Sequence, residues 1–333
     1  MHTGKLQLTL VDTTVLKGLA LLLLLCHHCW FTGDGFDDAY LQGVPVFKNL
    51  GIFCKVCVSI FVFLSGYGLT ESTMKKGGIR SIWGFYRRRY FRLMFNYWLI
   101  YLIFVPLGVF LFGRTFTLVY GEHWTIPAIA DFLGVHQLVM GSPMGYNPTW
   151  WFYSLIILLS LVYPVMWKYR TLWPLMIPCA FIGSIFYSTL DYCLPFICGM
   201  AVSLVKPELN GGGNSHVFIT LLFPFVCVFR FKISAPVLWD TAIVLYIVYI
   251  AKNFNWPQLL LSGLGFLGKH SFNIFLFHTF IFSYYFHEFI YWSRNPILIV
   301  LSLLLVCIAI SIAIERLKRL FHFERLQDQF AGH

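Results

Sequence analysis

A lysine and a histidine share one face of the first hydrophobic segment of the chain. Residues 15–31 read VLKGLALLLLLCHHCWF, an apolar run of the length that a membrane helix needs. In a helix the eleven residues from Lys17 to His28 return to within about 20° of the same direction, with a rise of roughly 16 Å. Ionisable side chains inside a membrane are costly and usually face a protein interior or an aqueous cavity. We therefore expect His28 to be the centre of any chemistry.

A second candidate is an arginine cluster that leads into the third hydrophobic segment. It contains Arg87, Arg88, Arg89 and Arg92, and the last two are three residues apart, hence on one helical face. Guanidinium groups bind phosphates bidentately, so this face is suited to a substrate that carries phosphates. The alternative is that these charges set orientation and touch anionic lipid head groups. The local sequence leaves both interpretations open.

Two segment ends carry polar and aromatic residues that are candidates for an acceptor site or cavity. Ser65 and Tyr67 lie in a small-residue stretch that closes the second segment and permits close helix approach. Asn147 precedes Trp150 and Trp151 at the start of the fourth segment. A tryptophan pair at a membrane interface anchors to head groups or forms a stacking platform for a sugar ring. Ordinary packing remains an alternative for the small residues.

The ninth segment and the cysteines also need interpretation. Ser271 and His278 are seven residues apart in the ninth segment, on nearly one helical face. A histidine at this depth is either a hydrogen-bonded packing residue or part of a polar cavity. The nine cysteines include Cys-x-x-Cys pairs at 26–29 and 54–57. Because both pairs fall in apolar runs, we expect packing residues and no metal site, with a metal or disulfide as the alternative.

Composition places the chain among integral membrane proteins. Hydrophobic residues make up 59% of the sequence and charged residues 11%, whereas a soluble domain has about 25% charged residues. The mean hydropathy is +0.74. The net charge of +10 lies mainly in short connections, so we interpret it as orientation charge and expect no nucleic-acid partner.

The apolar runs predict an all-α bundle of about ten transmembrane helices with a polar cavity. They occupy residues 15–31, 51–70, 94–113, 150–168, 172–189, 191–205, 215–231, 236–252, 264–285 and 296–315. The connection at 71–92 and the tail after the tenth segment are basic, while the connection at 32–50 is acidic. The positive-inside rule then places both termini in the cytoplasm. Arg230 and Lys232 are exceptions, since this orientation places them outside.

These features, in this order, resemble the membrane-bound acyltransferase-3 family. Five motifs carry the resemblance. The first is Lys17 and His28 with their spacing, together with the Gly18 that follows Lys17. The others are Phe61–Tyr67, Tyr86–Leu93, Pro148–Phe152 and Leu267–His278. The family's first motif is an arginine, ten intervening residues and then a histidine, and Lys17 and His28 match this spacing. Lysine at position 17 keeps the charge but lacks the bidentate fork of arginine.

The resemblance implies one acyltransferase-3-like transmembrane domain over residues 1–333. It implies transfer of an acyl group, acetyl by default, from acyl-CoA to a hydroxyl of a cell-surface polysaccharide or its lipid-linked precursor. Acyl-CoA would be a co-substrate with no permanently bound cofactor, and the expected location is the bacterial inner membrane. Lys17, Arg88, Arg89 and Arg92 would bind acyl-CoA, and His28 would act as general base or carry the acyl group itself.

Two further functions are weighed against acyl transfer. A transporter or flippase for a polysaccharide intermediate would line its path with the buried charges, but paired broken helices or repeated halves are not visible. A purely structural scaffold does not explain the spacing of Lys17 and His28. The sequence leaves open the acceptor, succinyl or another acyl group as donor, and the oligomeric state.

Overall fold

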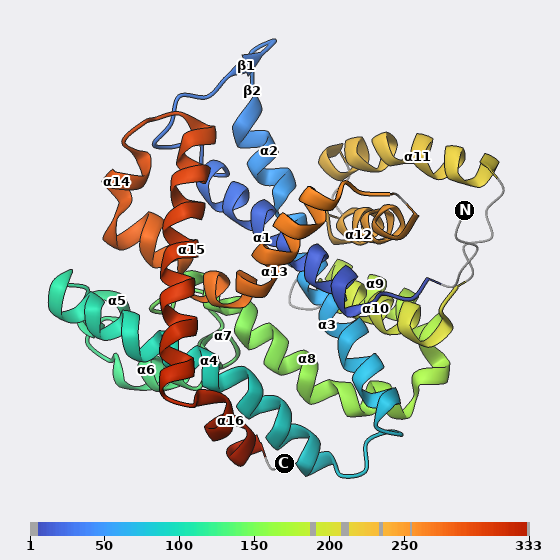
Figure 1. Ribbon diagram of the computed structural model, residues 1–333, viewed down its shortest axis with the longest axis horizontal. Coiled ribbons are helices and arrows are strands. Elements are labelled where there is room, and N and C mark those ends of the chain that lie inside the picture. Colours follow the sequence, from blue (N-terminus) through green and yellow to red (C-terminus); the bar gives the residue numbers. More distant parts are fainter. Residues whose placement is uncertain (1–5, 187–190, 208–212, 233–235, 254, 332–333) are drawn as a thin grey trace. The chain divides into compact units, whose positions relative to one another are not determined.

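The computed structural model of the chain is almost entirely helical (Figure 1), and it describes residues 6–186, 191–207, 213–232, 236–253 and 255–331. Two short strands, β1 (Tyr40–Leu41) and β2 (Val44–Pro45), pair antiparallel in the connection after the first helix. A backbone in lipid must satisfy its own hydrogen bonds, so long apolar segments fold as helices. The predicted all-α class is confirmed.

Each of the ten predicted segments contains a helix. These helices are α1 (Leu10–Trp30), α2 (Val46–Cys54) with α3 (Val56–Lys75), α4 (Ile82–Leu111), α8 (Trp151–Lys168), α9 (Trp173–Phe186), α10 (Cys193–Val205), α11 (Gly213–Lys232), α12 (Pro236–Asn253), α13 (Gln258–Thr279) and α15 (Pro296–Leu320). Within the described residues six spans are long and apolar enough to cross a membrane, namely α1, α2 with α3, α4, α8, α13 and α15. The chain is therefore a multi-pass membrane protein, and the count of about ten spans is not confirmed.

Shorter helices fill the connections. They are α5 (Phe116–Tyr120), α6 (Thr125–Phe132), α7 (His136–Met140), α14 (His287–Tyr291) and α16 (Phe323–Ala331). The first turn of the α8 segment, Pro148–Trp150, is a 3₁₀-helix, and α13 continues as a π-helix over Phe280–Tyr285.

Helix α4 begins at Ile82, earlier than the predicted start at residue 94, because the basic segment is itself helical. The side chain of Ser81 caps its first turn by accepting a hydrogen bond from the backbone N–H of Gly84 at 3.1 Å. The arginines therefore project from successive turns of a helix.

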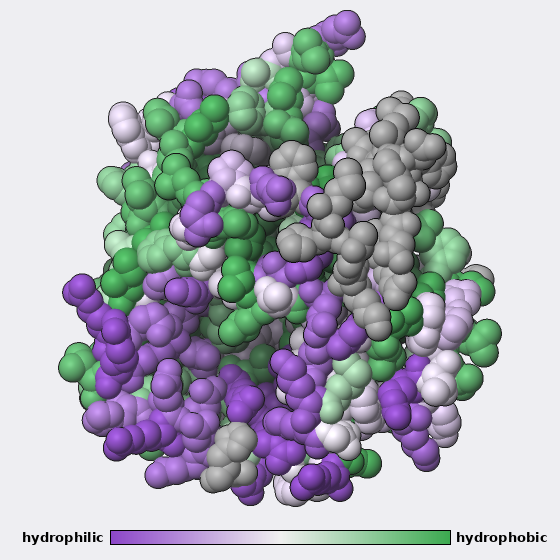
Figure 2. Space-filling view, turned by 45° about the vertical axis from the view of Figure 1, so that its right-hand side comes forward, coloured by the Kyte–Doolittle hydropathy of each residue, from purple (hydrophilic) through white to green (hydrophobic). Residues whose placement is uncertain are grey.

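The backbone contacts divide the chain into two compact units. Unit 1 contains Met1–Leu24, Phe53–Gly78 and Val165–Lys269, and unit 2 contains Leu25–Ile52, Ile79–Pro164 and His270–His333. Helices α1, α2, α8 and α13 each contribute one end to each unit. Large apolar side chains stay exposed in both, for example Leu175 in unit 1 and Phe110 in unit 2. Exposed apolar side chains are also evident in the space-filling view (Figure 2), as expected for a lipid-facing surface.

Glycines permit the close helix contacts of unit 1. Helices α3 and α10 lie side by side (Figure 1), and a Cβ at Gly66 or at Gly199 would come within 2.2 Å of a backbone oxygen of the other helix. The same holds where α1 meets α13, with 2.0 Å at Gly18 and 1.9 Å at Gly268. Only glycine fits such an approach, so the small residues of these motifs have a packing role.

Unit 1 also contains a buried ion pair between α11 and α12. The guanidinium of Arg230 pairs with the carboxylate of Asp240, and both side chains are only 4% exposed. Arg230, which fitted the predicted orientation poorly, is therefore held inside the fold by its acidic partner.

In unit 2 aromatic contacts join α4 to α8 and α13. Tyr97 stacks on Tyr153 with ring centroids 4.8 Å apart, and Phe104 stacks on Phe277 at 5.2 Å. The C-terminal helix α16 lies along α4 (Figure 1), where Phe330 contacts Phe91 at 5.7 Å. These contacts hold the arginine-bearing helix within this unit.

Candidate active site

Two histidines from different helices meet in unit 2. His28 lies in the last turn of α1 and His278 near the end of α13, with ring centroids 5.0 Å apart. Phe282 packs against both rings, at 5.9 and 6.0 Å. His278 is fully buried and His28 is partly exposed. Each histidine was a candidate from the sequence, but nothing in the sequence indicated that they meet.

Backbone contacts fix the tautomer of His278. Its Nδ1 lies 2.9 Å from the carbonyl oxygen of Phe275 and 3.0 Å from that of Ile274. A carbonyl oxygen only accepts, so Nδ1 carries the proton and Nε2 of the neutral ring keeps its lone pair. The π-helix begins two residues further on, and such helical irregularities are frequent at functional sites. The pair can therefore accept and transfer protons.

Asn147 and Trp150 support the helix that carries His278. The side-chain amide of Asn147 and the indole N–H of Trp150 both donate to the carbonyl of Leu276, at 3.2 and 2.9 Å. Trp150 is 3% exposed, and its ring packs against Tyr97 at 4.7 Å. In this structure Trp150 is thus a core residue that supports the helix carrying His278, rather than an open stacking surface or a head-group anchor.

Trp151 and Ser271 are two further candidates from the sequence that lie in unit 2. Trp151 is half-buried and makes an edge contact with Phe152, with ring centroids 6.1 Å apart. Ser271 is buried on α13, about two turns before His278.

The arginine face of α4 is partly tied to α8. Arg89 donates from Nε to the hydroxyl of Ser160 at 3.1 Å. Arg88 and Arg89 are half-buried, whereas Arg87 and Arg92 are exposed. The backbone carbonyl of Arg92 accepts a hydrogen bond from the side chain of Gln327 on α16 at 3.0 Å.

A groove of about 450 Å³ runs between α4 and α8 beside Arg89. Its walls are mainly aromatic and aliphatic, with Trp83 and Tyr90 on one side and Ile157 on the other. An apolar groove of this kind suits an alkyl chain, so phosphate binding by the arginines would have to occur at its rim.

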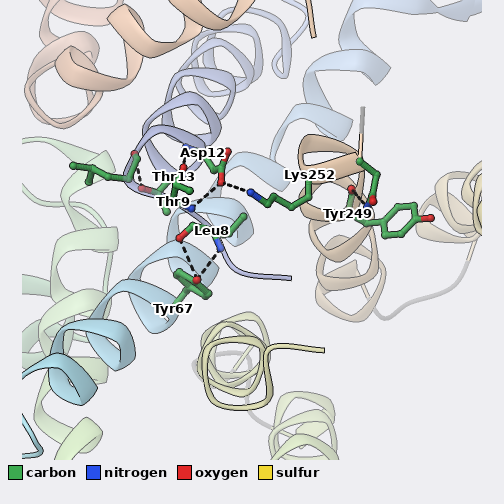
Figure 3. A network of polar contacts seen from close by, with 9 residues as sticks. Leu8, Thr9, Asp12, Thr13, Tyr67, Tyr249 and Lys252 are labelled. Atoms are coloured by element: carbon green, nitrogen blue, oxygen red, sulfur yellow. Dashed lines mark hydrogen bonds and ion pairs between the residues drawn. The ribbon is translucent and has the colours of Figure 1, made fainter. Parts of the chain in front are cut away.

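Lys17, Ser65 and Tyr67 belong to unit 1. Lys17 is exposed on α1, and Ser65 is half-buried on α3. The hydroxyl of Tyr67 accepts a hydrogen bond from the backbone N–H of Leu8 at 2.8 Å (Figure 3). The residues that the sequence grouped as acceptor or cavity candidates are therefore divided between the two units.

The structure also shows a polar cluster that the sequence analysis missed, in the connection between α4 and α8. Asp131 is 1% exposed and accepts hydrogen bonds from the hydroxyl of Tyr120 and, at 2.6 Å, from the backbone N–H of Tyr146. Burial raises the pKa of Asp131 and that of Tyr120. The guanidinium of Arg114 lies 3.6 Å from the ring centre of Tyr284 nearby. No motif marks this cluster, because its members are joined only by the folded connection.

The nine cysteines, all of which lie within the described residues, form no disulfides. Cys29, Cys54 and Cys57 are buried and Cys26 is half-buried. Across the residues that the structure describes, no group of three or more His, Cys, Asp or Glu side chains converges as metal ligands would.

The membrane-spanning helices define a multi-pass membrane protein, and the histidine pair is its candidate site. Comparison with protein families identifies the chemistry, since the acyltransferase-3 family, described as an acyltransferase domain, matches residues 11–316. The chain belongs to this family and is an acyltransferase. Comparisons with curated proteins and with solved structures give no significant match.

Proposed function

We propose that the protein transfers an acyl group, acetyl by default, from acyl-CoA to a hydroxyl of a cell-surface polysaccharide or its lipid-linked precursor. The observation that carries the proposal is the contact between His28 and His278, 5.0 Å between ring centroids, in a chain of an acyltransferase family. Transfer to a hydroxyl needs a base that is neutral before the reaction, and the imidazole of His28 beside the buried ring of His278 can provide one.

In the proposed reaction, His28 is the general base. It takes the proton from the acceptor hydroxyl while the hydroxyl oxygen attacks the thioester carbonyl carbon. The carbon–sulfur bond then breaks, and the CoA thiolate leaves with the proton that His28 returns. His278 Nε2, which keeps its lone pair, accepts a hydrogen bond from His28 and stabilises the imidazolium that forms.

The basic residues are assigned to the donor. Arg88, Arg89 and Arg92 offer guanidinium groups to its phosphates, and Lys17 adds a point charge. The roughly 16 Å along α1 from Lys17 to His28 is comparable with an extended pantetheine arm. The proposal places the termini and the basic segment in the cytoplasm of a bacterium, where acyl-CoA is made, and the acceptor on the opposite side near Trp151.

The test is calorimetric binding of acetyl-CoA to the purified protein in detergent, for the wild type and for Arg89→Ala/Arg92→Ala. We expect micromolar binding that the double variant loses. The matched control is Arg316→Ala/Arg319→Ala, which removes two exposed arginines with the same spacing from α15. Folded wild-type protein that binds no acetyl-CoA would contradict the proposed donor and favour a transporter.

A further inference from the structure

Within unit 2, the connection between α4 and α8 folds back along α4 instead of leaving it. The indole N–H of Trp98 on α4 donates to the carbonyl of Phe132 on α6 at 2.9 Å, and the two rings stack with centroids 5.7 Å apart. One turn further along α4, the sulfur of Met94 would lie 3.3 Å from a Cβ at Gly134. From Trp98 to Leu111, where α4 ends, the helix rises about 20 Å. The connection therefore returns over more than half of a hydrocarbon core about 30 Å thick.

The carbonyl groups at the end of α6 all find partners within the protein. A helix leaves its last carbonyls without partners in its own backbone, and water usually satisfies them at a surface. Here the carbonyls of residues 131–134 each accept a hydrogen bond from a side chain of α4 or α8, at 3.4 Å or less. The donors are, in that order, Tyr97, Trp98, Tyr90 and Ser154. Such complete pairing is what a backbone without access to water requires.

The side chains that this segment exposes are apolar. From residue 126 to residue 140, every exposed residue is apolar. On α6 and directly after it, these residues are Ile126, Ile129, Phe132 and Leu133. The exposed residues of α7, 138–140, are apolar as well. Exposed polar residues, Glu122 and His123, occur just before this stretch, and Trp124 beside them is of the residue type enriched at membrane interfaces.

The single ionisable residue of α6 points inward. Asp131 is buried, and its carboxylate accepts hydrogen bonds from Tyr120 and from the backbone of Tyr146. A helix at a water surface turns its polar face to the solvent and its apolar face to the core. Helix α6 has the reverse arrangement. Its exposed apolar face also continues onto a spanning helix, since Leu102, one turn after Trp98 on α4, is 62% exposed.

We propose that residues 126–140 form a re-entrant segment that lies within the hydrocarbon of the membrane, with Ile126, Ile129 and Leu133 in contact with lipid acyl chains. These three residues have the i, i+3, i+7 spacing of one helical face. The hydropathy of the sequence placed this stretch between two predicted spans, 94–113 and 150–168, because α6 and α7 are too short to cross a membrane themselves. The placement does not depend on the identity of the acyl donor.

The experiment measures the surroundings of residue 129 in the full-length protein, reconstituted in phosphatidylcholine vesicles. Ile129→Cys is combined with Cys179→Ser, which removes an exposed native thiol, and is labelled with a nitroxide. The signal of the Cys179→Ser protein alone is subtracted, because other native cysteines are half-buried. Collisions of the label are measured with oxygen, which concentrates in hydrocarbon, and with a water-soluble nickel complex.

Two labelled controls bracket the result. Leu102→Cys reports the lipid-facing surface of α4, and Glu122→Cys reports an exposed polar position in the same connection. The label at residue 129 should behave as the label at residue 102 does, with frequent oxygen collisions and loss of the nickel collisions seen at residue 122.

A charge tests the same position through stability. Ile129→Asp should lower the ratio of folded to unfolded protein about a hundredfold, because an aspartate within the hydrocarbon is costly. Its control is Leu41→Asp, which places the same charge at another exposed apolar residue, in the acidic connection after α1. There the ratio should change by less than about threefold, as at an ordinary water-exposed position. Titration with dodecyl sulfate in mixed micelles measures both ratios.

Three results would overturn the proposal. Nickel collisions as frequent at residue 129 as at residue 122 place the segment in water. Few collisions with either reagent show that protein, such as a second copy of this chain, covers this face instead of lipid. Wild-type stability of the Ile129→Asp protein would likewise contradict a position within the hydrocarbon.

Discussion

Unit 1 and the histidine site of unit 2 accommodate polar groups in different ways. Unit 1 contains charged groups that pair with one another, as in the buried Arg230–Asp240 pair and the Lys252–Asp12 pair. Around His278, neutral side chains donate hydrogen bonds to backbone carbonyls. The donors include the indole of Trp150 and the ring of His278 itself. Charged groups suit the recognition of phosphates, whereas a base must stay neutral until it takes a proton. The histidine site thus lies among neutral groups, as the proposed base requires.

The strongest test of this contrast is to break the charge pairing of unit 1. Asp240→Ala should lower the free energy of unfolding by roughly 3–5 kcal/mol, because it leaves the Arg230 guanidinium buried without its acid. Thermal unfolding in detergent measures the effect. Arg230→Met/Asp240→Leu should recover most of the loss, and a single variant as stable as the wild type would show that the pair does not contribute.

Removing the base should separate chemistry from binding. His28→Ala should lower kcat by at least about 100-fold, the size expected for a general base, while acetyl-CoA affinity stays unchanged. Release of the CoA thiol in the presence of acceptor membranes reports the rate. His27→Gln is the neighbouring control, since the Nδ1 of His27 lies 2.8 Å from the carbonyl oxygen of Gly51 and the residue is not assigned to the reaction.

A smaller effect is expected at the partner histidine. His278→Asn keeps a donor near the position of Nδ1 for the carbonyls of Ile274 and Phe275 but removes Nε2. We expect kcat to fall about tenfold, the loss of one hydrogen bond to a charged group, with an unchanged KM for acetyl-CoA. Wild-type turnover by this variant would limit His278 to packing.

The smallest change concerns the placement of Arg89. Ser160→Ala removes the hydroxyl that accepts from its Nε at 3.1 Å. The KM for acetyl-CoA should rise about threefold with kcat unchanged, since a loosened side chain loses rotamer entropy on binding. Steady-state kinetics measures both constants, and an effect on kcat alone would argue against a donor role for Arg89.

The sequence predicted the helices better than it predicted their contacts. Each predicted hydrophobic segment contains a helix, because in lipid a segment must form its backbone hydrogen bonds within itself. The early start of α4 was missed because the basic residues up to 92 were assigned to a connection between helices. The side chain of Ser81 nevertheless provides a helix cap there. The ion pair of Arg230 was not visible either, since its partner Asp240 lies on the next helix.

The candidate site shows the same limit. His28 and His278 were each singled out as ionisable groups at membrane depth, yet their contact depends on the packing of α1 against α13 in unit 2. The burial of Trp150 and the cluster around Asp131 depend in the same way on helices and connections that the sequence does not place. Periodicity along one helix is visible in a sequence, whereas contacts between helices are not.

The most direct measurement of the central claim follows labelled acetyl groups from acetyl-CoA into product. Bacterial membranes that contain the wild type or the His28→Ala protein are supplied with acetyl-CoA labelled in the acetyl group. The carbohydrate fraction is then extracted and tested for alkali-labile label. The account predicts ester-linked label with the wild type and its loss with His28→Ala, at equal protein levels. Equal labelling by the two proteins, or none by the wild type, would contradict it.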